Sequence, residues 1–95
     1  LIMDDMVDTA GTLTKAADVL KAKGATSVMA CCTHGVLSGP AYQRITDSAL
    51  DELVITDTIP LKAEHDKITV LTASEITAKT ISRIYTNESI QSIFI

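Results

Sequence analysis

Carboxylates, hydroxyls and a glycine are concentrated near the start of the chain, in the run Asp4-Asp5-Met6-Val7-Asp8-Thr9-Ala10-Gly11-Thr12. Small residues allow backbone N–H groups to approach an anion closely, and the first turn of a following helix adds unpaired donors. Carboxylate oxygens accept hydrogen bonds from sugar hydroxyls or bind a hard cation. The run therefore predicts a site for a group that carries both a phosphate and a polyol, such as a sugar phosphate.

This run is expected to connect a buried strand to a helix. The apolar residues Leu1–Met3 precede it, and apolar side chains recur at helical spacing within a helix predicted at Thr12–Lys23. A second short, buried strand is predicted at Ser27–Cys32. Strand, helix and strand in this order form a βαβ unit with parallel strands and a right-handed crossover. Ligands of open α/β sheets bind at the carboxyl ends of such strands, which suits the position of the run.

The remaining sequence predicts a loop, two more strands and two more helices. In chain order these are the loop Thr33–Pro40, a helix at Ala41–Asp47, strands at Leu53–Thr56 and Ile68–Leu71, and a helix at Ala73–Tyr85. Ser74 is expected to cap the last helix, whose inner face would carry Ile76, Thr80, Ile81 and Ile84. The apolar tail Asn87–Ile95 is expected to dock on this domain, on a missing part of the protein or on a neighbouring subunit.

The composition indicates one small globular domain. Of the 95 residues, 46% are apolar and 21% charged, which supports a core and argues against disorder. One Phe, two Tyr and no Trp require that core to be aliphatic. A net charge of −4 disfavours nucleic acid as a partner, and no apolar run approaches the roughly 20 residues that a membrane span needs. Because the chain starts without Met inside an apolar run, we interpret residues 1–95 as the carboxy-terminal part of a larger domain.

Several residues allow a structural or a functional interpretation. Cys31 and Cys32 are neighbours whose side chains would point to opposite faces of a strand, so a disulfide between them would be strained. We interpret them as small buried residues of a protein in the reducing cytosol. The alternative, a redox or metal-binding role, is less favoured. His34 is interpreted as structural, His65 as exposed, and Ser38 as a cap of the following helix.

The loop residues also have structural alternatives. Asp4 and Asp5 could form a solvated strand end, and Gly11 could serve only as a turn residue with a positive φ. Thr9 and Thr12 could cap the helix instead of contacting a phosphate. The complete run favours the ligand interpretation, because these residue types occur together.

The opening run resembles the phosphoribosyl-pyrophosphate loop of type I phosphoribosyltransferases and ribose-phosphate pyrophosphokinases. In that loop an acidic pair follows a strand, matched here by Asp4 and Asp5, and a D-T-x-G-T segment is matched by Asp8–Thr12. Three later blocks resemble the pyrophosphokinases alone, and they are Thr33–Ala41, Ser48–Pro60 and Asn87–Phe94. The residues of the first of these blocks indicate no mechanism by themselves. Together the matches cover nearly the whole chain in the right order.

The resemblance implies an α/β fold of the type I phosphoribosyltransferase kind, with three αβα layers and a mainly parallel sheet. It implies transfer of pyrophosphate from ATP to the 1-hydroxyl of ribose 5-phosphate, with Mg²⁺, to give phosphoribosyl pyrophosphate and AMP. By position, the residues that would bind ribose 5-phosphate are Asp4, Asp8, Thr9, Ala10, Gly11 and Thr12, with Asp5 in support. The ATP pocket, the catalytic residues and most Mg²⁺ ligands would lie before Leu1, so we assign no catalytic or metal-binding residue to this chain and expect it to be inactive alone.

Members of this family commonly form hexamers that phosphate and ADP regulate at a site between subunits. The closing motif that contributes to that site is matched by Ser89 and Phe94, whereas Gln91 stands where a serine is usual, which puts this regulation in doubt. Two other readings keep the fold, namely a non-catalytic homologue that modulates the enzyme and a phosphoribosyltransferase. The intact loop argues against the first, and the later blocks argue against the second.

Overall fold

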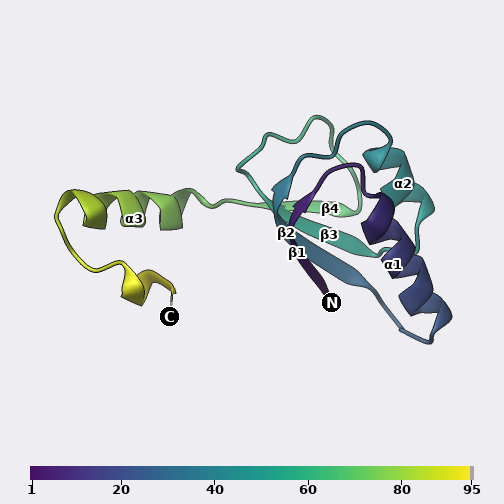
Figure 1. Cartoon of the computed structure of the whole chain (residues 1–95). Helices are drawn as coiled ribbons and strands as arrows, with labels where there is room; N and C mark the ends of the chain where they lie inside the picture. The colour runs from purple at the N-terminus through teal and green to yellow at the C-terminus, as the bar shows by residue number, and fades with distance from the viewer. Residues whose placement is uncertain (95) are drawn as a thin grey trace.

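Four strands form one parallel sheet in the order β1-β2-β3-β4 (Figure 1), in a computed structural model that describes residues 1–94. The strands are β1 (Ile2–Val7), β2 (Met29–Gly35), β3 (Glu52–Thr56) and β4 (Ile68–Leu71). The helices are α1 (Gly11–Ala22), α2 (Ala41–Asp47) and α3 (Ser74–Tyr85), followed by a short 3₁₀ helix, η1 (Gln91–Phe94). This arrangement confirms the predicted α/β class and the predicted parallel sheet.

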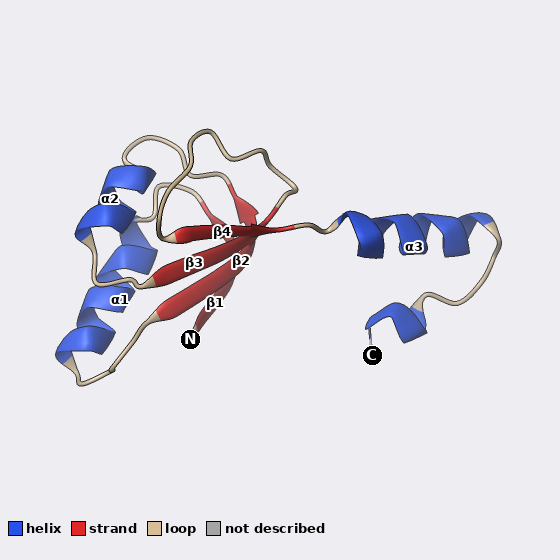
Figure 2. Ribbon diagram, turned by 180° about the vertical axis from the view of Figure 1, so that it is seen from behind, coloured by secondary structure: helices blue, strands red, loops and turns tan. Residues whose placement is uncertain are grey.

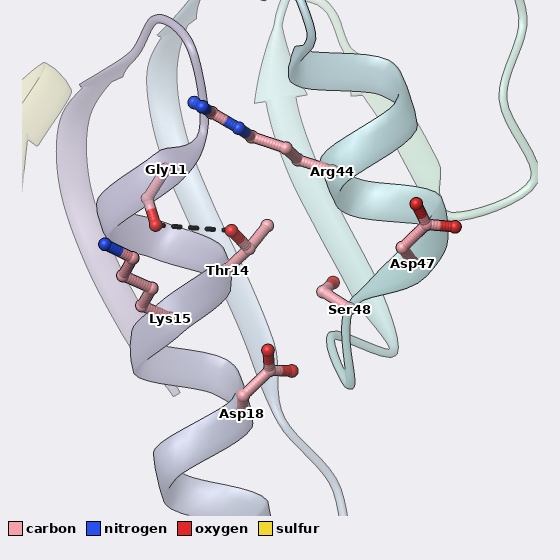
Figure 3. Close-up of a pocket in the computed structure, with 7 residues that line it drawn as sticks. All are labelled: Gly11, Thr14, Lys15, Asp18, Arg44, Asp47 and Ser48. Carbon is pink, nitrogen blue, oxygen red and sulfur yellow. Dashed lines mark hydrogen bonds between the residues drawn. The ribbon is translucent and has the colours of Figure 1, made fainter.

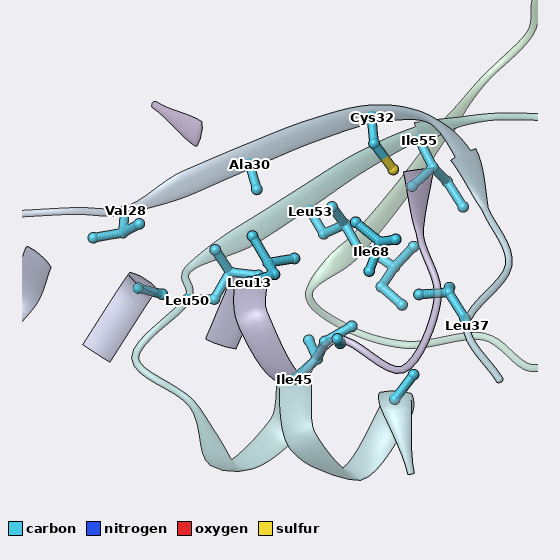
Figure 4. Packing of buried hydrophobic residues seen from close by; sticks show 14 residues of the cluster. Leu13, Val28, Ala30, Cys32, Leu37, Ile45, Leu50, Leu53, Ile55 and Ile68 are labelled. Atoms are coloured by element: carbon cyan, nitrogen blue, oxygen red, sulfur yellow. The ribbon is translucent and has the colours of Figure 1, made fainter. Parts of the chain in front are cut away.

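Helices α1 and α2 lie side by side on one face of the sheet (Figure 2). The side chains between these helices and the sheet are aliphatic, as Figure 4 shows, and Leu53 and Ile45 are fully buried among them. Alternate residues of β2 and β3 point into this layer, because successive strand residues face opposite sides. Cys32 is one of them, and burial raises the pKa of its thiol. It is the small buried residue that the sequence predicts.

The opposite face of the sheet is not covered within residues 1–94. The register aligns Met3, Cys31, Val54 and Thr69 across the four strands on that face. Met3 is 74% exposed, and Cys31 is half-buried. The second helical layer expected for a three-layer αβα domain is therefore not formed by the described residues.

Helix α3 extends away from the sheet (Figure 1) and buries none of its residues. The predicted inner face is exposed, since Ile81 and Ile84 are 63% and 62% accessible. Amphipathic spacing predicts that a helix has a contact face, but it does not say which partner covers that face. Ser74 is the first helical residue and not its cap, because the cap position is Ala73, whose N–H donates to Asp57 Oδ1 at 2.9 Å. Within residues 1–94, no helix is long and apolar enough to cross a membrane.

The tail folds back on α3 and not on the sheet. Arg83 Nη1 donates to the carbonyl of Ser89 at 3.1 Å and to the hydroxyl of Ser92 at 2.5 Å. Ile90 and Ile93 are half-buried there, whereas Ile95 lies outside the described residues.

The segment Asp8–Ala10 connects β1 to α1 and is called the ligand loop below. Strands β1 and β2 both extend further toward this loop than the sequence predicts. The predicted strand at Leu1–Met3 continues to Val7, so Asp4 and Asp5 lie within β1. The predicted strand at Ser27–Cys32 begins and ends later, at Met29–Gly35. Both extensions follow from pairing, because the parallel ladder continues to the pair Val7 and Gly35. Local composition does not reveal where a partner strand ends.

Gly35 permits close packing against β3. A Cβ at this position would lie 2.7 Å from Ile55 Cδ1 and 3.2 Å from its Cγ2. We expect Gly35→Ala to lower the free energy of unfolding by about 1–3 kcal/mol, the usual cost of overpacking a core. Urea unfolding followed by circular dichroism measures this. Ile55→Val removes Cδ1, so the double variant should recover part of the loss, and a Gly35→Ala variant as stable as the parent would contradict the assignment.

Asp51 ties the start of β2 to the start of β3. Its Oδ2 accepts the N–H of Val28 at 2.8 Å, its own N–H donates to the Val28 carbonyl at 2.8 Å, and Lys21 Nζ lies 3.4 Å away. The hydrogen bond from Val28, aided by Lys21, lowers the pKa of the Asp51 carboxyl. A lowered pKa in the folded state contributes stability that is present above the unfolded pKa of about 4 and is lost as the pH falls through the folded value.

Asp51→Asn should therefore lower stability at pH 7, and the difference from the parent should shrink as the pH falls below about 4. Urea midpoints at several pH values measure this. The exposed Asp66 provides the control, since Asp66→Asn should change the stability at pH 7 by less than about 0.5 kcal/mol. A difference between parent and Asp51→Asn that is independent of pH would refute the proposed linkage.

Candidate functional site

A cavity of about 320 Å³ lies between β1 and the N-terminus of α1. Most of the residues predicted to bind a ligand line it, namely Asp4, Asp8, Thr9, Ala10, Gly11 and Thr12. Asp5 does not line it, because neighbouring strand residues point to opposite sides. Asp5 instead donates its backbone N–H to Asp4 Oδ1 at 2.8 Å. The structure therefore separates the two adjacent carboxylates and places one of them in the cavity.

The loop between β1 and α1 has its carbonyl groups bonded and its N–H groups free. The carbonyls of Val7, Asp8, Thr9 and Ala10 all accept hydrogen bonds from other parts of the chain. By contrast, no backbone N–H from Asp8 to Leu13 donates to an acceptor within residues 1–94. Peptide N–H groups need partners as strongly as carbonyls do. A row of free donors beside a cavity is therefore suited to an anion.

The left-handed residue of this loop is Ala10, and not the glycine. Ala10 has φ 63° and ψ 13°, occupies the cap position of α1 and is only 4% exposed. Gly11 does not have a positive φ, which excludes the alternative that it is a turn residue of that kind. Neither Thr9 nor Thr12 caps α1 with its side chain, which excludes the alternative of helix caps. Thr14 instead donates from its hydroxyl and its N–H to the Ala10 carbonyl, at 2.7 and 3.0 Å.

The block that follows β2 holds the ligand loop. The N–H groups of Val36 and Leu37 donate to the Val7 carbonyl at 3.0 and 3.1 Å, and the N–H of Ser38 donates to the Asp8 carbonyl at 3.0 Å. The Ser38 hydroxyl also donates to Asp8 Oδ1. Ser38 is not the side-chain cap of α2 that the sequence suggested, because the cap position is Pro40 and carries no side-chain cap. The residues of the block Thr33–Ala41 indicated no mechanism by themselves, and the structure shows that part of this block is hydrogen-bonded to the ligand loop.

Arg44 is a contact of this loop that the sequence did not reveal. It lies on α2, and its Nη1 donates to the Thr9 carbonyl at 3.1 Å. Arg44 also lines a second cavity of about 250 Å³ between α1 and α2, with Gly11 and Lys15 on the opposite helix (Figure 3). Arg44 and Thr9 are 35 residues apart in the sequence, so no local sequence pattern predicts their contact.

His34 and His65 were also singled out from the sequence, and neither lines the 320 Å³ cavity. His34 lies within β2, and its Nδ1 is 2.8 Å from the Thr58 hydroxyl. His65 is half-buried and not freely exposed, since its Nδ1 accepts the N–H of Lys67 at 3.0 Å. Cys31 lines the 320 Å³ cavity, but no group of three or more potential metal ligands occurs within the described residues.

The tail residues predicted to bind a regulatory anion lie beyond α3, far from the ligand loop in Figure 1. Ser89 accepts the N–H of Gln91 on its hydroxyl at 3.3 Å. Phe94 closes the 3₁₀ helix η1, and its side chain lies outside the described part of the chain. The structure does not bring this group together with the loop.

Comparisons with known proteins identify similar chains. Residues 1–95 match the family described as "Phosphoribosyl synthetase-associated domain". The chain is 59% identical over 95 residues to a protein of Campylobacter jejuni named ribose-phosphate pyrophosphokinase, and 56% identical over 95 residues to a protein of the same name from Wolinella succinogenes. In both cases 100% of this chain is covered, and it spans 31% of the length of the relative.

A solved structure has the same fold. The phosphoribosylpyrophosphate synthetase from Mycobacterium smegmatis matches with a TM-score of 0.86 at 38% sequence identity. The match covers 90% of this chain and 29% of that structure.

The left-handed conformation of Ala10 predicts how substitutions there behave. Ala10→Gly relieves about 1 kcal/mol of backbone strain but loses a buried methyl and gains unfolded-state entropy, so stability should change by less than about 1 kcal/mol. Ala10→Val places a β-branched residue in the same conformation and overfills the site, at a cost of about 2 kcal/mol or more. Urea unfolding of both variants measures this, and equal stability of the two would refute the assigned conformation.

Proposed function

The chain belongs to the family described as a phosphoribosyl synthetase-associated domain, and we propose that it binds ribose 5-phosphate within a ribose-phosphate pyrophosphokinase, the family that its sequence blocks resemble. In this proposal residues 1–95 are the carboxy-terminal part of a domain whose remaining parts bind ATP. The complete enzyme transfers pyrophosphate from ATP to the 1-hydroxyl of ribose 5-phosphate. The products are phosphoribosyl pyrophosphate and AMP.

The observation that carries the proposal is the row of free N–H groups from Asp8 to Leu13 beside two carboxylates in one cavity. The N–H groups and the start of α1 suit the 5-phosphate, because both present positive partial charge. The carboxylates of Asp4 and Asp8 are acceptors for ribose hydroxyls. Asp5 lies outside the cavity, so we assign it a supporting role through water or a cation.

The contribution of this part to the reaction is orientation. Phosphoryl-type transfer depends mainly on placing the nucleophile in line and on neutralising phosphate charge. The loop supplies the first, because it fixes the sugar phosphate by its 5-phosphate. Mg²⁺ would supply the second, and it is commonly held by one or two carboxylates together with substrate phosphates. As the family resemblance implies, we place most of its protein ligands outside this chain.

Assembly and regulation are also part of the proposal. The exposed apolar residues of α3, including Ile81 and Ile84, suit packing against another subunit of a hexamer. The tail residues Ser89, Gln91 and Phe94 would contribute to an anion site between subunits. Gln91 has an amide that can still donate to an anion, although it reaches further than a serine hydroxyl.

A chimera tests the proposed function. This chain replaces the matched 95 residues of the Campylobacter jejuni relative, and synthesis of phosphoribosyl pyrophosphate is followed at varied ribose 5-phosphate and ATP. We expect the chimera to be active and the isolated chain to be inactive. Asp8→Ala should raise KM for ribose 5-phosphate by about tenfold or more, with KM for ATP changed by less than about twofold.

Ser38→Ala is the matched control, because it removes the hydroxyl that donates to Asp8 but leaves the carboxylate. Its effect on KM for ribose 5-phosphate should be smaller than that of Asp8→Ala. Unchanged kinetics of Asp8→Ala in an active chimera would refute the assigned site. Turnover of ATP by the isolated chain, detected as heat in a calorimeter, would refute the division of the active site.

A further inference from the structure

Arg44 connects α2 to the loop in front of α1. Its Nη1 donates to the Thr9 carbonyl at 3.1 Å, and the side chain reaches across the gap between the helices (Figure 3). The guanidinium occupies the space beside Gly11, where a Cβ would lie 3.0 Å from Nη1 and 3.7 Å from Cζ. A side chain at position 11 would therefore press on the guanidinium and shift it by a few tenths of an ångström.

The Thr9 carbonyl differs from its neighbours in how it is held. The carbonyls of Val7 and Asp8 accept backbone N–H groups of Val36, Leu37 and Ser38. Within residues 1–94, the Thr9 carbonyl accepts no backbone N–H, and its only donor is the Arg44 side chain. Within residues 1–94, Arg44 is therefore the one hydrogen-bond donor that restrains the carbonyl of the peptide between Thr9 and Ala10.

That peptide orientation decides where a ligand donor points. In a trans peptide the carbonyl of one residue and the N–H of the next point in opposite directions, and no cis peptide occurs within residues 1–94. A donor that holds the Thr9 carbonyl on the α2 side consequently directs the N–H of Ala10 to the opposite side. Ala10 lines the 320 Å³ cavity, whereas Arg44 does not line that cavity.

We propose that Arg44 is a positioning residue for the ribose 5-phosphate loop: it holds the Thr9 carbonyl so that the Ala10 N–H points toward the phosphate. This inference rests on the proposed function of the loop. Arg44 acts through Thr9 and does not touch the ligand. Gly11 leaves room for the guanidinium beside the loop, which assigns the glycine a role separate from close approach of the ligand.

Kinetics of the chimera defined above test this role. Arg44→Met removes the guanidinium and keeps an apolar stem. We expect KM for ribose 5-phosphate to rise about tenfold, as for loss of a hydrogen bond from a charged donor. KM for ATP and kcat should change by less than about twofold, because the loss concerns binding of one substrate.

Lys15→Met is the charge-matched control. Lys15 lines the same 250 Å³ cavity as Arg44 but, within the described residues, donates no hydrogen bond to Thr9. It should change KM for ribose 5-phosphate by less than about twofold. If Lys15→Met and Arg44→Met raise KM equally, the effect is general electrostatics and the proposal is overturned. An unchanged KM in Arg44→Met overturns it as well.

Gly11→Ala and the double variant separate the two roles of the glycine. Alone, Gly11→Ala should raise KM for ribose 5-phosphate by a smaller factor than Arg44→Met, because the new methyl shifts Nη1 without removing it. Combined with Arg44→Met, it should add little, since the space it needs is already vacant. Effects that multiply would show that Gly11 acts on the ligand independently of Arg44, against the proposal.

A measurement without catalysis keeps this inference distinct from the proposed function. An inactive chimera, or unchanged kinetics of Asp8→Ala, would count against the function and not against Arg44. In the 95-residue chain, ¹⁵N order parameters of the Thr9, Ala10 and Gly11 amides should fall in Arg44→Met and stay unchanged in Lys15→Met. Equal order parameters in the parent and in Arg44→Met would overturn the positioning role.

Discussion

The carbonyl groups of Val7, Asp8 and Thr9 are all held from one side, and the candidate site depends on this constraint. Their donors come from the segment Val36–Arg44, so the peptide planes of the loop cannot rotate without breaking these hydrogen bonds. Since the N–H groups of the same peptides must face the other way, the cavity receives a row of donors. The direction in which this loop presents its N–H groups is thus set by the segment Val36–Arg44.

The parallel sheet makes this contact possible. Strands β1 and β2 are neighbours that end together, with Val7 opposite Gly35, so the loops that follow them start side by side. Two residues in these loops, Ala10 and Leu37, have positive φ values of 63° and 51° without being glycine. Such conformations cost energy and persist only where the surroundings fix them. Both residues are almost fully buried, so packing against the sheet holds the strained backbone in place.

The sequence predicted those parts of the structure whose signals are local. Helix α2 and strand β4 have the expected bounds, and the run from Asp4 to Thr12 was recognised because its residue types occur together. The predictions failed where a distant partner decides. Strand pairing extended β1 and β2 beyond their apolar residues, and the amphipathic stripe of α3 could not reveal that its contact face is exposed in this chain. Arg44 was missed for the same reason, because only the packing of α2 beside α1 brings it to Thr9.

The charges around the cavity bear on which ligand it would select. Asp4 and Asp8 line it, and Asp8 is bonded to the neutral hydroxyl of Ser38, not to a cation. Two carboxylates repel an approaching phosphate, so neutral N–H dipoles must outweigh them, and free inorganic phosphate would gain little from the site. A sugar phosphate changes this balance, because its hydroxyls donate to the carboxylates while its phosphate accepts from the loop. In the proposed function, the same acidic residues that weaken binding of a simple anion would therefore make the site selective for a phosphate that carries a polyol.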